Sequence, residues 1–245
     1  MISKYKEFRR DYYLYKNIVH KCNLINGSNA DASGMWKYFF RWRKSVKNGA
    51  SSMIDRLPWI TFEATDLLNN KLKSCEKVFE FGGGGSTLFF LDRNVDLITV
   101  EHNQEWFAEL TKKIGKNEKW KGVLKLPISI DNFDKLEIGN PDHYISDDSN
   151  FKNKSFINYV NFIDEFENNS FDIVCIDGRA RPSCVKHAIP KLKKGGWLIL
   201  DNSERDYYNE SKRLLDDKTF KIILDRTSAV IYSVTADKTA IWEKL

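Results

Sequence analysis

A run of four glycines, Gly82 to Gly85, follows the apolar segment 77–81 and is itself followed by two hydroxyl residues, Ser86 and Thr87. Glycines lack Cβ and allow the backbone to approach a ligand closely, and N–H groups at the beginning of a helix favour anionic groups. Glu101 ends the next apolar segment, 19 residues after Gly82. A carboxylate at that point can accept hydrogen bonds from both ribose hydroxyls of a nucleoside. The spacing therefore predicts a nucleoside-containing cofactor.

Two cofactor classes share this geometry, the dinucleotides and S-adenosylmethionine. Glu80 precedes the glycines by two residues, and its carboxylate would repel a pyrophosphate but tolerate a sulfonium and an amino group. Thr87 stands where the third glycine of GxGxxG would be. Asp177 and Asp201 end two later apolar segments, so we expect acidic groups around the cleft. These features favour S-adenosylmethionine, and the absence of GK[ST] after the glycines excludes a P-loop.

The elements that must position these residues alternate between strand-like and helix-like segments. Strands are predicted at 77–81, 95–100, 123–130, 171–176, 197–200, 220–224 and 240–243, and helices at 61–72, 86–91, 103–114, 182–192 and 204–215. This alternation predicts an α/β fold with a doubly wound, mainly parallel sheet of seven strands, whose last two strands form an antiparallel hairpin at the edge. Residues 131–170 interrupt the alternation, and an insertion of this length tends to be functional or mobile.

The first 50 residues differ in charge from the remainder of the chain. They contain 11 Lys or Arg and three Asp or Glu, a net charge of +8, whereas the other 195 residues contain 28 and 31, a net charge of −3. Ten of the 33 aromatic residues also lie there. Such a segment could touch RNA, an anionic membrane surface or an acidic substrate. Because aromatic residues at helical spacing usually pack, we expect residues 1–70 to form a helical cap or arm on a cofactor-binding domain of residues 71–245.

Composition excludes several other classes of protein. Hydrophobic residues make up 42% and charged residues 30% of the chain, which is a globular composition. No apolar stretch approaches the roughly 20 residues of a membrane-spanning helix, and the charged N-terminus does not resemble a secretory signal, so we expect a cytoplasmic protein. The four cysteines form no CxxC pair and the four histidines show no HExxH spacing, which argues against a disulfide scaffold or a zinc site.

Four motifs, in this order, resemble those of class I S-adenosylmethionine-dependent methyltransferases. They are EFGGGGST at 80–87, VEHNQEW at 100–106, FDIVCIDGRARPSC at 171–184 and KKGGWLILDNSERDYY at 193–208. With the PWIT segment at 58–61, the chain is similar to an uncharacterised bacterial subgroup of that family. The resemblance covers roughly residues 57–208 and implies a Rossmann-like methyltransferase fold.

The resemblance also implies roles for individual residues. Glu80 and the glycines would hold the methionine part of the cofactor, Glu101 the ribose, and Asp177 would face the sulfonium. His102 would lie beside the adenine, whose pocket would be completed near Ile130 and Asp131. The full predicted cofactor set is Trp59, Thr61, Glu80, Gly82, Gly83, Gly84, Ser86, Thr87, Glu101, His102 and Asp177.

Asp177, Asp201 and Asn202 end two neighbouring predicted strands and form a candidate metal site. Two carboxylates and an amide oxygen suit Mg²⁺, and a metal could lower the pKa of an acceptor hydroxyl. The arrangement is similar to that of catechol-type O-methyltransferases, although Ala180 stands where those enzymes carry a lysine. The alternative is that Asp201 and Asn202 cap the following helix.

Arg179 and Arg181 follow Asp177 closely, and with it they form the predicted catalytic set. Guanidinium groups bind carboxylate or phosphate in a bidentate manner, so these arginines could grip an acidic acceptor such as a uronic acid or a sugar phosphate. The alternative is that they form ion pairs with Glu204 or Asp206.

The resulting hypothesis is transfer of a methyl group from S-adenosylmethionine to a small-molecule or glycan-type acceptor, with oxygen as the expected methylated atom. One alternative is an NAD-dependent oxidoreductase. The other is a nucleic-acid-binding protein or RNA methyltransferase that uses the basic N-terminal arm. This second alternative is less favoured, because the chain beyond the arm is net acidic.

Overall fold

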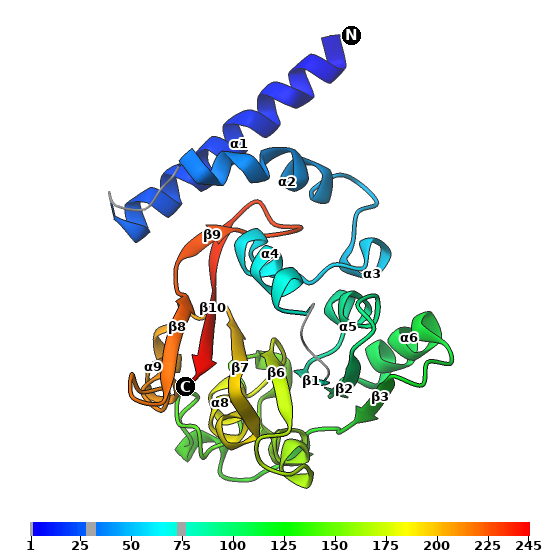
Figure 1. Cartoon of the computed structure of the whole chain (residues 1–245), viewed down its shortest axis with the longest axis vertical. Coiled ribbons are helices and arrows are strands. Elements are labelled where there is room, and N and C mark those ends of the chain that lie inside the picture. Colours follow the sequence, from blue (N-terminus) through cyan, green and yellow to red (C-terminus); the bar gives the residue numbers. More distant parts are fainter. Residues whose placement is uncertain (1, 28–32, 73–76) are drawn as a thin grey trace.

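The computed structural model describes residues 2–27, 33–72 and 77–245, and its centre is an eight-stranded sheet (Figure 1). The strand order is β3-β2-β1-β6-β7-β10-β8, and β9 pairs with β10 outside this path. The bounds are β1 (Lys77–Phe81), β2 (Asp96–Glu101), β3 (Trp120–Leu124), β6 (Phe171–Ile176), β7 (Leu192–Asp201), β8 (Phe220–Leu224), β9 (Thr227–Ala229) and β10 (Ala236–Lys244).

Parallel pairing brings the carboxyl ends of four strands to one edge of the sheet. Phe81 at the end of β1 pairs with Val100 of β2 and with Ile176 of β6, and Ile176 pairs with Leu200 of β7. The residues that follow these positions therefore meet at the carboxyl edge, where ligands bind in such sheets. The last strand, β10, runs antiparallel to both β7 and β8, so the predicted antiparallel pairing of the two final strands is confirmed.

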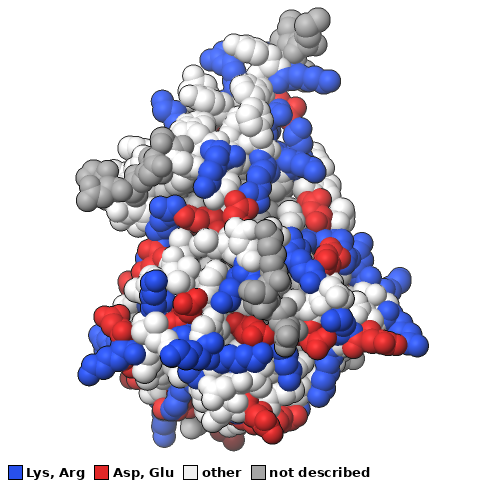
Figure 2. Space-filling model, in the orientation of Figure 1, with Lys and Arg blue, Asp and Glu red and all other residues white. Residues whose placement is uncertain are grey.

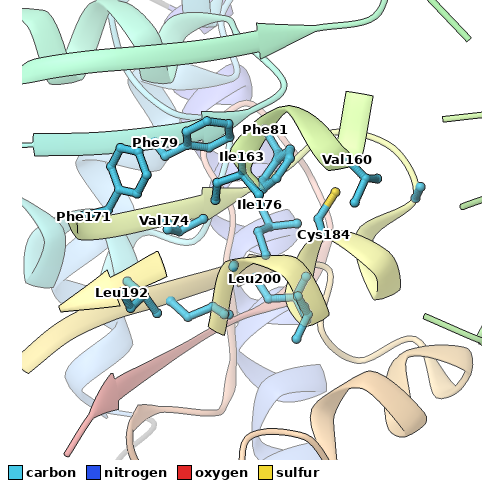
Figure 3. Close-up of a cluster of buried hydrophobic side chains, with 14 of the residues drawn as sticks. Phe79, Phe81, Val160, Ile163, Phe171, Val174, Ile176, Cys184, Leu192 and Leu200 are labelled. Atoms are coloured by element: carbon cyan, nitrogen blue, oxygen red, sulfur yellow. The ribbon is translucent and has the colours of Figure 1, made fainter. Parts of the chain in front are cut away.

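Both faces of the sheet are covered, which confirms the doubly wound α/β prediction. Alternate residues of the strands point to opposite faces, so that Phe79 and Phe81 belong to one buried cluster and Val78 to another. Figure 3 shows part of the first cluster, to which Phe79 and Phe81 of β1, Cys184 of α8, and Val160 and Ile163 of the insertion belong. The helices of this region are α3 (Ser52–Asp55), α4 (Phe62–Lys71), α5 (Gly85–Leu91), α6 (Gln104–Ile114), α8 (Arg181–Ala188) and α9 (Asn209–Lys212).

Two predicted elements had wrong bounds. The strand predicted at 123–130 is β3 at Trp120–Leu124, because Pro127 has no N–H to continue the ladder. Ile128–Ser129 forms β4 instead, which pairs with β5 (Lys154–Ser155) in a separate two-stranded sheet. The helix predicted at 204–215 is only a short 3₁₀ turn, Asp206–Tyr208, followed by α9.

Two further boundaries differ because of backbone chemistry and pairing. The helix predicted at 182–192 ends at Ala188 and continues as the 3₁₀ turn Ile189–Lys191, because Pro190 cannot donate a helical hydrogen bond. The strand predicted at 197–200 is the longer β7, since it pairs with both β6 and β10. The insertion contains α7 (Ile157–Val160) and the 3₁₀ turns Phe133–Lys135, Ser149–Phe151 and Asn161–Glu165.

The N-terminal helices α1 (Ile2–Asn26) and α2 (Phe39–Ser45), joined to the 3₁₀ turn Ser33–Tyr38, form a cap above the sheet edge (Figure 1). Tyr15, Phe39 and Trp42 are buried in its core with ring centroids 5.1 to 6.3 Å apart. These aromatic residues pack, as their helical spacing predicts. Figure 2 shows Lys and Arg side chains over the outside of the cap, so the basic excess remains at the surface.

The cap rests on the C-terminal strands as well as on α4. Ala229, Ile231 and Ala236 belong to the same buried cluster as Tyr15 and Trp42. Trp42 Nε1 donates to Ser233 O at 2.7 Å, and Asn26 Nδ2 donates to Thr227 O at 2.7 Å. The proposed division near residue 70 stays a prediction. Among the described residues, no helix is both long enough and apolar enough to cross a membrane.

Replacement of Trp42 by alanine tests the aromatic core of the cap. Trp42 has no exposed surface, so Trp42→Ala should lower the free energy of unfolding by about 3–5 kcal/mol, through lost burial and a cavity. Phe40→Ala, on the same helix but with a side chain that is 72% exposed, is the matched control and should change stability little. Urea denaturation of both variants checks this, and equal losses would contradict the packing described.

Candidate functional site

A cavity of about 350 Å³ lies at the carboxyl ends of β1, β2 and β6. This volume lies within the range of small-molecule sites, roughly 300–1,000 Å³. Most of the predicted cofactor residues line it, namely Trp59, the glycines 82–84, Ser86, Glu101, His102 and Asp177. The structure therefore brings together residues that are more than 100 positions apart in the sequence.

The glycine turn forms one wall of this cavity. Gly82 has φ +89°, and a Cβ there would lie 2.8 Å from Gly178 Cα, so only glycine fits between β1 and the end of β6. The N–H groups after it have fixed partners: Gly83 N donates to Glu101 Oε2 at 3.0 Å, and Gly84 N donates to Thr87 Oγ1 at 2.9 Å. These hydrogen bonds connect the turn to the carboxyl end of β2 and to the first turn of α5.

Glu101 is held by backbone N–H groups at the tip of β2. Its Oε1 accepts hydrogen bonds from His102 N at 2.8 Å and Asn103 N at 2.9 Å, and Oε2 accepts the one from Gly83 N. Burial alone would raise the pKa of Glu101, but the hydrogen bonds from His102 and Asn103 lower it overall. The carboxylate is therefore ionised at neutral pH, and the single hydrogen bond from Gly83 leaves Oε2 able to accept others.

Glu80 lies beneath the glycine turn and does not line the cavity. Its side chain is fully buried, and Oε2 accepts hydrogen bonds from Thr87 Oγ1 at 2.6 Å and Thr99 Oγ1 at 2.9 Å. Among the described residues, none forms a hydrogen bond with Oε1. Burial raises the pKa of Glu80 to about 7, against the opposing hydrogen bonds from Ser86, Thr87 and Thr99.

Thr61 and Thr87 also lie outside the cavity wall. Thr61 Oγ1 accepts from Ala64 N at 3.3 Å and begins α4, and Thr87 joins the glycine turn to Glu80. Both are buried and hold the surrounding backbone. Ile130 and Asp131, expected near the adenine, are not part of the wall either.

The insertion at residues 131–170 packs against His102. The rings of Phe151, Phe156 and Tyr159 lie 5.2, 5.5 and 5.9 Å from the His102 ring, each in an edge-on arrangement. The insertion therefore supports the His102 side chain from behind, and none of its own residues lines the cavity.

The structure does not support the predicted Mg²⁺ site. Asp177, Asp201 and Asn202 do converge, but the guanidinium of Arg181 lies among them. Its Nη2 donates to Asp177 Oδ1 at 2.9 Å, and its Nη1 lies 3.3 Å from Asn202 Oδ1 and 3.6 Å from Asp201 Oδ2. A cation is thus already supplied by the chain, and no cluster of three or more His, Cys, Asp or Glu suited to a metal occurs among the described residues.

Arg181 is buried, which also removes it from the predicted role of gripping an acidic acceptor. Arg179 lies in the cavity wall, but its Nη2 forms an ion pair with Asp148 Oδ2 at 2.7 Å. The ion-pair partners of both arginines therefore differ from Glu204 and Asp206, the alternative partners expected from the sequence. Sequence spacing could not reveal Asp148, because it comes from the insertion.

A second cavity of about 220 Å³ adjoins the first and shares Trp59 and Asp177 with it. Its other lining residues are Asp201, Asn202, Val230 and Asp237. Asp201 Oδ1 accepts a hydrogen bond from Thr239 Oγ1 at 2.8 Å, which ties the end of β7 to β10. The C-terminal strands thus contribute to this cavity as well as to the core of the cap.

Comparison with solved structures identifies the architecture. The O-methyltransferase from Bacillus cereus, solved in complex with S-adenosylhomocysteine (SAH), is similar with a TM-score of 0.50 and 11% sequence identity, over 87% of this chain and 91% of that one. The chain has the Rossmann-like methyltransferase fold. No protein-family model and no curated protein sequence matches it.

Two other solved structures are similar at lower scores. A methyltransferase-like protein from Silicibacter pomeroyi has a TM-score of 0.46 and 18% identity, over 77% of this chain and 90% of that one. The fibrillarin pre-rRNA processing protein from Methanococcus jannaschii has a TM-score of 0.43 and 16% identity, over 82% and 77%.

Five residues that line this methyltransferase-fold cavity were not in the predicted sets: Ser52, Gly85, Asn103, Trp106 and Gly178. Trp106 Nε1 donates to Gly83 O at 2.7 Å, so its indole supports the glycine turn from the first turn of α6. Its position, five residues after Glu101, could have indicated from the sequence that Trp106 lies near the glycine turn. Ser52 comes from α3, for which the sequence offers no comparable signal.

Glu80→Gln tests the buried carboxylate. The folded protein keeps the Glu80 proton up to a pKa of about 7, whereas an ordinary glutamate loses it near 4.5. Between these values the native state binds more protons than the unfolded chain, so stability should fall as pH rises, by at most about 1.4 kcal/mol per pH unit. Glu80→Gln should make the free energy of unfolding, measured by urea denaturation, depend less on pH between pH 5 and 7. Part of the dependence should remain, because burial also raises the pKa of Asp201 to about 7. Exposed Glu105→Gln is the control; identical slopes in wild type and Glu80→Gln would refute this assignment.

Mg²⁺ should not bind between Asp177, Asp201 and Asn202, because the Arg181 guanidinium already occupies the space among these side chains. Millimolar MgCl₂ should leave the Tm unchanged relative to NaCl at equal ionic strength, since only ligands that bind the native state raise it. Differential scanning calorimetry checks this, and a saturable rise in Tm with Mg²⁺ would restore the metal hypothesis.

Proposed function

We propose that this protein is an S-adenosylmethionine-dependent methyltransferase. The observation that carries the proposal is the cavity in which an ionised Glu101 and the glycine turn face Asp177 across the ends of three parallel strands. Bound there, S-adenosylmethionine supplies a methyl group on a positively charged sulfur, and the protein supplies alignment and electrostatics.

The residues of the cavity match the parts of this cofactor. Glu101 Oε2 would accept hydrogen bonds from the ribose hydroxyls, and His102 with its surrounding aromatic rings would lie beside the adenine. The glycine turn lets the methionine part approach the backbone. Asp177 beyond the turn places a carboxylate on the side where the cofactor carries its sulfonium and amino group, and Glu80 beneath the turn, with a pKa of about 7, is ionised in part at neutral pH.

The NAD-dependent alternative is less well supported. A dinucleotide-binding sheet has the strand order 3-2-1-4-5-6, whereas this sheet places the antiparallel last strand, β10, between β7 and β8. Glu80 also puts a carboxylate under the turn where a pyrophosphate would lie.

The nucleic-acid alternative is weakened by the packing of the cap. Tyr15, Phe39 and Trp42 are buried within it and are not available to stack on bases. Arg43 of α2 forms an ion pair with Asp11 at 2.9 Å. An RNA complex with a steep salt dependence, lost when the cap is deleted, would favour this alternative.

Substitution of Glu101 tests the cofactor assignment. Glu101→Ala should weaken binding of S-adenosylmethionine and of SAH by about 1–3 kcal/mol, because charge-assisted hydrogen bonds to the ribose are lost. Isothermal titration calorimetry measures this. Glu105→Ala is the matched control, since Glu105 is exposed on α6 and should leave both affinities unchanged.

Two results would count against the proposal. Wild-type protein that is folded yet binds neither S-adenosylmethionine nor SAH would eliminate it. Quenching of tryptophan fluorescence by NADH, with no response to SAH, would favour the oxidoreductase instead.

A further inference from the structure

The second cavity has the position of an acceptor site, if the first holds the methyl donor as proposed above. The two cavities share Trp59 and Asp177, so a group in the second lies next to the donor across these two side chains. At about 220 Å³ it is smaller than a typical small-molecule pocket and suits one functional group with its neighbouring carbons.

The charges around this cavity are predominantly negative. Three of its six lining residues are aspartates, and none of the described residues that line it is Lys, Arg or His. Arg181 approaches Asp177 and Asp201, but it lies behind the wall with 7% of its surface exposed and donates also to Gly178 O and Asp201 O. Arg181 is therefore shared by Asp177 and Asp201, and it forms no hydrogen bond or ion pair with Asp237.

The guanidinium of Arg181 does not compensate the negative charge of Asp237. Asp237 Oδ2 accepts a hydrogen bond from Thr235 Oγ1 at 3.3 Å, and no described residue forms an ion pair with it. The neighbouring Lys238 pairs with Asp225 at 3.0 Å, and Lys21 donates to Ala236 O. Both nearby lysines are thus engaged elsewhere.

Trp59 provides a separate observation at the same cavity. Its side chain is 56% exposed and lines both cavities, and among the described residues its one aromatic ring pair is a T-shaped contact with Tyr232, with centroids 6.1 Å apart. An indole face open to a cavity attracts a cation. An exposed tryptophan and the uncompensated carboxylate of Asp237 both favour a positively charged ligand.

We propose that the acceptor is an amine, which enters as its ammonium and is held by Asp237, Asp177 and the indole of Trp59. This differs from the oxygen acceptor expected from the sequence, and it replaces the acidic acceptor that Arg179 and Arg181 were expected to grip. Those arginines bind Asp148, Asp177 and Asn202 instead.

The reaction balances without any further reactant. The ammonium gives one proton to a carboxylate lining the cavity, which frees the nitrogen lone pair. That pair forms the new N–C bond as the C–S bond breaks, and the electrons of the C–S bond stay on sulfur. The products are SAH, a neutral thioether, and an N-methylated ammonium.

Matched probes test the charge preference in the full-length protein saturated with SAH. Benzylamine, benzyl alcohol and benzoate have similar shape but carry positive, no and negative charge at neutral pH. Their dissociation constants are measured by NMR titration. We expect benzylamine to bind about tenfold more tightly than either of the others, as a partly buried charge pair would give.

Two variants locate the effect. Asp237→Asn should reduce the preference for benzylamine several-fold while the affinity for SAH, which reports folding and the donor cavity, is retained. Asp217→Asn is the matched control, because Asp217 is exposed and distant in sequence from the cavity residues; its preference should equal that of the wild type.

The outcomes separate this inference from the proposed function. Loss of SAH binding by the wild type would overturn the methyltransferase proposal itself. If SAH binds normally but benzylamine binds no more tightly than benzyl alcohol or benzoate, the amine acceptor alone is overturned. The same holds if SAH binds normally and none of the three probes binds. An unchanged preference in Asp237→Asn would also overturn it.

Discussion

The buried guanidinium of Arg181 holds the ends of β6 and β7 in one arrangement, and both cavities depend on it. It donates to the backbone carbonyls of Gly178 and Asp201 and to the side chain of Asp177. A buried charge is tolerated only when it is paired and hydrogen-bonded, and here the pairing also fixes Asp177, the carboxylate that lines both cavities. Ala180 and Asn202, on either side of this contact, have left-handed backbone with φ +49° and +51°, a strain that persists where the surrounding structure enforces it.

Sequence patterns predicted the features that depend on local chemistry. The strand at 77–81, the glycine turn after it and the carboxylate at Glu101 all follow from residues adjacent in the chain and from one parallel pairing. Their geometry is set by backbone rules that apply to any doubly wound sheet. The same rules place Asp177 at the shared edge, since it follows a strand that pairs directly with β1.

The features that were missed depend on contacts between distant segments. Arg181 lies four residues after Asp177, yet only the packed structure shows that it fills the space between β6 and β7, where spacing alone suggested a metal ion. Arg179 pairs with Asp148 of the insertion, a segment whose composition carries no regular periodicity. Strand β3 was misplaced because its length is set by its pairing with β2 and by Pro127, and the apolar pattern extends beyond both.

The contact between the helices of the cap and the strands β9 and β10 has a consequence for biosynthesis. The helices of the cap are translated before the strands that complete it, since Asn26 is hydrogen-bonded to Thr227, 201 positions further along the chain. Until that stretch has been translated, the apolar side of the nascent N-terminal helices has no native partner and is open to chaperones or to premature association. The same late segment carries Val230 and Asp237, so a truncated or stalled chain would lack both the docked cap and one wall of the second cavity. The architecture therefore delays completion of the second cavity until residues 227–237 have been translated.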